Sequence, residues 1–120
     1  MSAAETVTTM IAAWERLDAA AVTACFFEDG IWHNMPFGPI AGRAAIASAV
    51  EAFLADMTEA EFIFRHQGEI AAGVVVNERT DIFRSKDGKV LTIPVMGVFE
   101  IENGEIRAWR DYFDANVMNG

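Results

Sequence analysis

The 120-residue sequence contains one cysteine, Cys25, and no long uninterrupted apolar run. A single cysteine excludes an intrachain disulfide and a zinc site built from clustered thiolates, and it suits a reducing compartment. No run of about 18 apolar residues occurs, and no basic segment followed by an apolar one marks the N-terminus, so neither a membrane span nor an export signal is indicated. We therefore expect a cytoplasmic protein without a membrane partner.

Basic residues and histidines are scarce as well. Nine Lys and Arg stand against 18 Asp and Glu, which gives a net charge of -9. Such a surface repels phosphate backbones, so no nucleic-acid partner is expected. The two histidines could form a metal site only together with several carboxylates, and we predict no metal. The hydrophobic share of 52% is enough for one core, so residues 1–120 are predicted to form a single domain.

The first half of the chain carries helix signals. Ser2 and Glu5 have the spacing of a capping box, and the apolar residues that follow recur at helical intervals, which predicts a first helix. Asp18 can cap a second, short helix through residues 22–26, which is expected to end near Gly30 because glycine readily adopts the left-handed C-cap conformation. The stretches 31–35, 36–42 and 46–57 then indicate a strand, a loop with two prolines and two glycines, and a third helix.

The second half is rich in strand signals. Glycine-containing turns at 86–88 and 103–104 separate long runs of β-forming residues, which predicts an antiparallel meander and hence an α+β fold. Pro94 lacks a backbone donor, so it is expected at an edge or a bulge. The predicted strands are 61–70, 74–84, 89–101 and 105–113.

Several strands place polar residues in apolar surroundings. Because side chains alternate across a strand, Arg79 and Asp81 share one face, and Trp32 and Asn34 share another. Asp111 lies between two aromatic residues on its own face. Buried carboxylates are stable only when paired or neutralised, so we expect a raised pKa at Asp81 or Asp111. This pattern fits either a general acid and base pair or a structural ion network.

Four motifs occur in the order and at nearly the separations found in limonene-1,2-epoxide hydrolases: EDGIWHNMP at 28–36, ERTDIFR at 78–84, GVF at 97–99 and WRDYFD at 109–114. The chain resembles this family from about the first helix to Asp114. The resemblance implies a cone-shaped nuclear transport factor 2-like fold. In that fold three N-terminal helices pack on a curved, mixed, mostly antiparallel sheet and enclose a pocket.

The resemblance also implies roles for individual residues. Asp111 would take a proton from water, Asp81 would protonate the epoxide oxygen, and Arg79 would bridge the two carboxylates in one concerted step. Asn34 matches the asparagine that holds the water, whereas Trp32 stands where the family has a tyrosine. An indole N–H donates a hydrogen bond but accepts none, unlike a phenol, so the water must be held differently here. Neither a metal nor an organic cofactor is implied.

The implied substrate is a small apolar epoxide, cyclic and terpenoid epoxides included, and the product is a vicinal diol. Two other functions stay open: a carboxylate-based isomerase or cyclase of the ketosteroid isomerase or SnoaL-like type, and a non-catalytic module that binds small molecules. We further expect a homodimer that pairs through the outer sheet face. The predicted substrate wall consists of Phe53, Phe83, Ile93 and Val95.

Overall fold

Three helices, six strands and a short 3-10 helix make up the fold in a computed structural model that describes residues 1–119. The helices are α1 (Ala3–Glu15), α2 (Ala19–Ala24) and α3 (Arg43–Leu54), and the 3-10 helix is η1 (Ala115–Asn119). The strands are β1 (Phe26–Asn34), β2 (Ile40–Ala41), β3 (Met57–Ala71), β4 (Val74–Ser85), β5 (Val90–Glu102) and β6 (Glu105–Tyr112).

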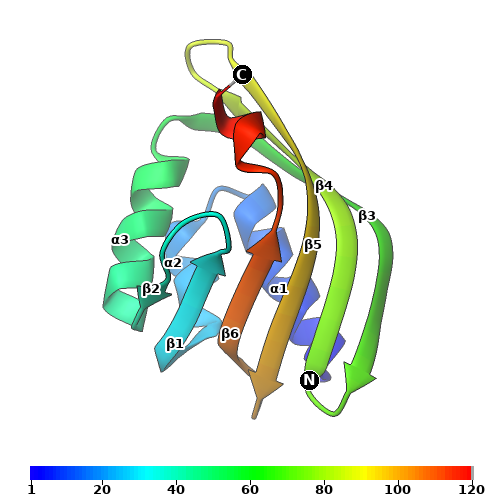
Figure 1. Ribbon diagram of the computed structural model, residues 1–120. Coiled ribbons are helices and arrows are strands. Elements are labelled where there is room, and N and C mark those ends of the chain that lie inside the picture. Colours follow the sequence, from blue (N-terminus) through cyan, green and yellow to red (C-terminus); the bar gives the residue numbers. More distant parts are fainter. Residues whose placement is uncertain (120) are drawn as a thin grey trace.

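The strands form one sheet in the order β2-β1-β6-β5-β4-β3. Strands β3 to β6 form the predicted antiparallel meander, and β1 joins β6 in parallel, so the sheet is mixed. The sheet curves, the helices cover one of its faces, and the C-terminal segment lies near one end (Figure 1). The predicted α+β architecture, with three N-terminal helices on a curved and mostly antiparallel sheet, is therefore confirmed.

Local signals located the first helix and the hairpin turns correctly. The Ser2–Glu5 capping box is present at the start of α1. Gly88, Asn103 and Gly104 have positive φ angles in the two predicted turns. Pro94 pairs with β4, but the paired part of β6 ends opposite Met96, so Pro94 lies on a locally free edge of β5, as expected.

The predicted boundary between the second helix and the first strand was wrong. Helix α2 ends at Ala24, and β1 already begins at Phe26, whose fully buried ring belongs to the core. Gly30 lies within this strand with an ordinary φ, and an added Cβ would meet the carbonyl oxygens of Phe27 and Ile106 at 3.1 Å. Pairing with the distant β6 overrides the local helix signal here. Met57, predicted in the third helix, likewise begins a strand, β3, where it pairs with Ser85 of β4.

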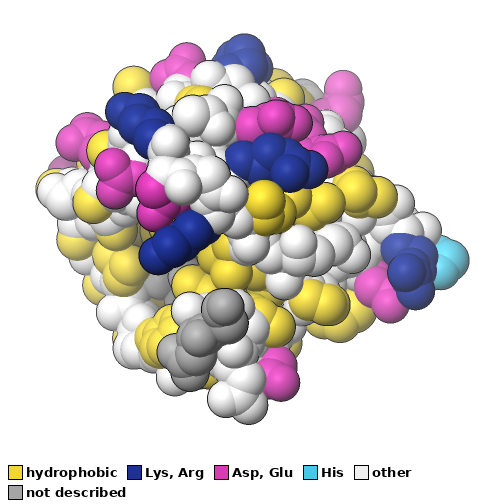
Figure 2. Space-filling view, turned by 90° about the horizontal axis from the view of Figure 1, so that it is seen from above, with side chains coloured by type: hydrophobic (Ala, Val, Ile, Leu, Met, Phe, Trp, Pro, Cys, Tyr) yellow, Lys and Arg dark blue, Asp and Glu magenta, His cyan; other side chains and the backbone are white. Residues whose placement is uncertain are grey.

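The outer sheet face, turned away from the helices, exposes several large hydrophobic side chains, including Ile63, Met96 and Tyr112. Figure 2 shows hydrophobic and charged side chains interspersed at the end of the molecule nearest the C-terminus. Pairing of two copies through the outer face stays a prediction. Among residues 1–119, no helix is long and apolar enough to cross a membrane.

Candidate active site

The inner faces of β4 and β6 bring together the charged residues that the sequence analysis singled out. Arg79 and Asp81 follow one another on the inner face of β4, and Asp111 lies on β6. Strand β5 separates them, and its Gly97 pairs with Asn77 on one side and with Asp111 on the other. Because Gly97 has no side chain, the Arg79 side chain can cross β5 and reach β6. A Cβ at this position would overlap the Arg79 guanidinium.

Arg79 binds both carboxylates with its guanidinium group. Its Nε donates to Asp81 Oδ1 at 2.8 Å, and its Nη2 donates to Asp81 Oδ2 at 3.1 Å and to Asp111 Oδ2 at 2.5 Å. Its Nη1 donates to Asn77 Oδ1 at 2.7 Å. Four of the five guanidinium N–H groups therefore have acceptors, which fixes the plane of the group.

The carboxylates are almost entirely removed from solvent, and their titration changes accordingly. The side chain of Arg79 is 0% exposed, and those of Asp81 and Asp111 are 6% and 7% exposed. Burial raises the pKa of Asp81 to about 7, although the positive charge of Arg79 acts in the opposite direction. Burial also raises the pKa of Asp111. Burial lowers the pKa of the Arg79 guanidinium, but the negative charges of Asp111 and Asp81 outweigh this effect. The pKa of Arg79 is therefore raised, and the group stays charged.

Asp111 has further polar neighbours. The Trp109 indole Nε1 donates to Asp111 Oδ1 at 2.6 Å, two residues back on the same face. Asn34 is the register partner of Asp111 across the parallel pair of β1 and β6, and both line the same pocket. A small molecule at the pocket floor can therefore contact an amide and a carboxylate at once.

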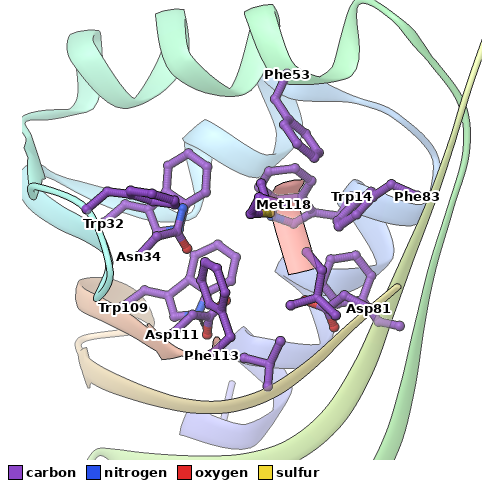
Figure 3. A pocket seen from close by; sticks show the side chains of 14 residues that line it. Trp14, Trp32, Asn34, Phe53, Asp81, Phe83, Trp109, Asp111, Phe113 and Met118 are labelled. Carbon is purple, nitrogen blue, oxygen red and sulfur yellow. Dashed lines mark hydrogen bonds between the residues drawn. The ribbon is translucent and has the colours of Figure 1, made fainter. Parts of the chain in front are cut away.

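A pocket of about 260 Å³ opens above these groups. Side chains from α1, α3, β1, β4 and β6 point into this space (Figure 3). Phe53, Phe83, Ile93 and Val95, the predicted substrate wall, all line it, together with Asn34, Asp81 and Asp111. The remaining lining residues are Trp14, Trp32, Phe37, Phe62, Trp109, Phe113 and Met118. The polar groups are thus confined to one part of an otherwise apolar pocket.

Trp32 lies in this wall with its ring stacked on Trp109, the centroids 5.5 Å apart. Its indole nitrogen is buried and has no hydrogen-bond partner among residues 1–119, and the same holds for the indole nitrogen of Trp14. His33 faces away from Trp32, as strand alternation predicts, and its Nε2 lies 2.8 Å from the Phe37 carbonyl oxygen.

The structure adds residues that the sequence analysis missed. Asn77 and Gly97 complete the surroundings of Arg79, and Trp14 and Met118 close the pocket from α1 and η1. Asn77 could have been found, because it precedes Arg79 by two residues on the same strand face. Among residues 1–119, no group of three or more His, Cys, Asp and Glu is arranged to hold a metal ion.

Comparison with known proteins places this site in context. Residues 1–119 match the family model of the limonene-1,2-epoxide hydrolase catalytic domain. The chain is 33% identical over 101 residues to the epoxide hydrolase EphG of Mycobacterium tuberculosis; the match covers 84% of this chain and 66% of that relative, just under two thirds of its length.

Two solved structures have the same fold. An M. tuberculosis LEH-like epoxide hydrolase has a TM-score of 0.85 and 28% identity, with coverage of 98% of this chain and 86% of that one. An NTF2-like protein of unknown function from Burkholderia pseudomallei has a TM-score of 0.82 and 22% identity, with coverage of 98% and 95%. The second likeness shows the fold alone.

Proposed function

Because the chain belongs to the limonene-1,2-epoxide hydrolase family, we propose that it adds water to a small apolar epoxide and releases a vicinal diol. The observation that carries the proposal is the bridge of Arg79 between two buried carboxylates at one end of an apolar pocket. Epoxide opening needs a base that activates water and an acid that protonates the ring oxygen. Two carboxylates in unlike surroundings can divide these tasks.

Charge balance supports this division. One buried guanidinium offsets one carboxylate, so a second ionised carboxylate beside it would leave an uncompensated buried charge. The pair therefore retains a proton near neutral pH, in keeping with the raised pKa of Asp81. We assign this proton to Asp81, as the general acid. Asp111, which accepts from both Arg79 and Trp109, is the base.

The reacting water is assigned to the space between Asn34 and Asp111, the paired residues of β1 and β6. Trp32 cannot replace the family's tyrosine as an acceptor, and its N–H is buried. We assign Trp32 the role of shaping the pocket wall beside the water. The proton leaves the water for Asp111 as the oxygen attacks an epoxide carbon, and Asp81 protonates the oxygen released from that carbon. Proton transfers of this kind each contribute about 10²–10⁴-fold.

Diol formation from limonene oxide, cyclohexene oxide and styrene oxide tests the proposal. The purified protein is expected to convert at least one of them with saturation kinetics, and gas chromatography separates diol from epoxide. Absence of diol from all three at rates above buffer would contradict the proposed activity.

The alkaline limb of the pH–rate profile is expected to begin about one unit below pH 7, to reach half of the maximal rate near pH 7 and to fall about tenfold per pH unit well above it, because the catalytic proton on Asp81 is lost as pH rises through its pKa of about 7. A pH–rate profile between pH 5 and 9 measures this limb. Asp81→Asn cannot lose that proton, so its residual rate should show no such decline. The same alkaline limb in the variant would assign the titration to another group.

A further inference from the structure

More than half of the residues in the pocket wall are aromatic. Eight of its fourteen lining residues are Phe or Trp, and its volume of about 260 Å³ lies below the roughly 300–1,000 Å³ typical of drug-sized ligands. Only a compact ligand therefore fits into this pocket. Its polar part must lie at Asn34, Asp81 and Asp111, since every other side chain of the wall is that of Phe, Trp, Ile, Val or Met.

Around Phe53 and Phe83, the rings of this wall stand at steep angles to one another. The Phe83 ring stands at 87° to Phe53, with centroids 4.8 Å apart, and at 90° to Phe62, with centroids 5.7 Å apart. Trp14 meets Phe53 at 72°. A wall of this kind presents ring edges and ring faces to the same space. An aromatic guest can therefore form edge-to-face pairs with it, which a saturated ring cannot do.

The position of Phe83 relates this wall to the reacting groups. Phe83 is the next inward-facing residue after Asp81 on β4, about 7 Å along the strand. Phe53 reaches the same region from α3 (Figure 3). A substrate ring packed against Phe83 and Phe53 can lie close to an oxirane at Asp81 when the ring and the oxirane are joined directly or through one carbon.

We propose that the pocket selects a compact aryl epoxide, with one aromatic ring joined to the oxirane directly or through one carbon. This inference rests on the proposed epoxide hydrolysis and names its substrate class. One aromatic pair corresponds to a roughly 2- to 12-fold preference beyond the effect of buried area.

The test compares benzyloxirane with (cyclohexylmethyl)oxirane. Both separate the ring from the oxirane by one carbon, so the aromatic ring does not activate ring opening. Burial of apolar area alone would favour the saturated ring, which is the larger one. We expect a kcat/KM for diol formation that is roughly 2- to 12-fold higher for benzyloxirane.

Two variants localise the preference. Phe83→Leu should bring the ratio of the two kcat/KM values toward one, because it removes from the wall the ring that forms edge-to-face pairs with both Phe53 and Phe62. Phe27→Leu is the matched control, since Phe27 lies outside the pocket under the Arg107 guanidinium. It should leave the ratio unchanged. Diol from both epoxides with a ratio of one or less would overturn the aryl preference and leave the hydrolase activity standing. Diol from neither of them, nor from the three epoxides above, would overturn both.

A separate observation concerns Asn77, which does not line this pocket. Asn77 is 1% exposed, accepts from Arg79 Nη1 at 2.7 Å, and donates from Nδ2 to Gln67 Oε1 at 3.1 Å. Gln67 is its register partner on β3. The hydrogen bond to Gln67 thus fixes the Asn77 amide, and the amide oxygen in turn binds the Arg79 guanidinium. It is a neutral acceptor, so it orients Arg79 without competing with Asp81 and Asp111 for its charge.

We infer that Asn77 is a positioning residue that fixes the Arg79 guanidinium between the two carboxylates. Asn77→Ala should lower kcat at least tenfold with little change in KM. Asn77→Asp keeps an acceptor of the same shape and should retain more activity than Asn77→Ala. Its added carboxylate should also move the alkaline limb of the pH–rate profile to higher pH.

Val75→Ala controls for a general loss of stability, because Val75 is an apolar residue that is fully buried on the same strand face and does not line the pocket. Its kcat should equal that of the wild type when both are folded, as judged by circular dichroism. An unchanged kcat in Asn77→Ala, or an equal loss in Val75→Ala, would overturn the positioning role.

Discussion

Replacing Asp111 with Asn is expected to lower kcat for epoxide hydrolysis by about 10²–10⁴-fold, the usual contribution of a positioned general base. The amide keeps the shape of the carboxylate but cannot take a proton from water. The substitution also removes the negative charge to which Arg79 and Trp109 donate hydrogen bonds. Initial rates of diol formation at pH 6.5 measure the effect. Circular dichroism should show a folded protein, since the side-chain volume is unchanged.

Asp114→Asn is the matched control for this change. Asp114 is an exposed carboxylate three residues further along the chain, and it accepts a hydrogen bond from the Asn116 backbone N–H outside the pocket. Its removal should leave the rate within about twofold of wild type, because exposed charges act weakly on a distant site. A rate above one tenth of wild type in Asp111→Asn would refute the role of Asp111 as the base.

The second large effect is expected from Gly97→Ala, a change of one methyl group. The added Cβ would overlap Arg79 Nη1 and would lie 2.8 Å from Asp111 Oδ1 and 2.9 Å from Asn77 Oδ1. Three polar groups would have to move apart at once. We expect kcat to fall at least 100-fold, because a displacement of about 1 Å at a catalytic group can have this effect. Overpacking should also lower the free energy of unfolding by about 1–3 kcal/mol.

Gly68→Ala separates these effects from the general cost of alanine in a strand. Gly68 lies on β3, and a Cβ there would meet no atom of residues 1–119 within 4 Å. It should leave kcat unchanged. Urea denaturation of both variants and of the wild type gives the free energies of unfolding. A wild-type kcat in Gly97→Ala would refute the claim that catalysis requires Arg79 to cross β5 at the position of Gly97.

The distribution of polar residues on the strands could be predicted from the sequence because it depends on local geometry. Strand alternation alone places Arg79 with Asp81 on one face and Trp32 with Asn34 on another. The structure brings Trp32, Asn34 and Asp81 to the same pocket as Asp111, and Arg79 binds the two carboxylates from outside the pocket lining. The hairpin turns and the capping box were predictable for the same reason, since each depends on a few neighbouring residues.

The conversion of residues 26–30 from predicted helix to strand could not be read from local signals. Phe26 and Ile31 pair with β6, about eighty residues away in the chain, and this pairing includes a bulge. Local propensity and long-range pairing favour different structures here, and the pairing prevails because it also buries the Phe26 ring.

The charged residues and the sharing of strand faces follow from the sequence, because covalent spacing and strand alternation suffice for both. The form of the site depends on tertiary contacts. The register of β4, β5 and β6 places Gly97 between Asn77 and Asp111, and this gap allows Arg79 to reach across a strand. Packing of the helices against the sheet then removes both carboxylates from water. That desolvation raises the pKa of Asp81 to about 7, a property that the isolated motif does not have.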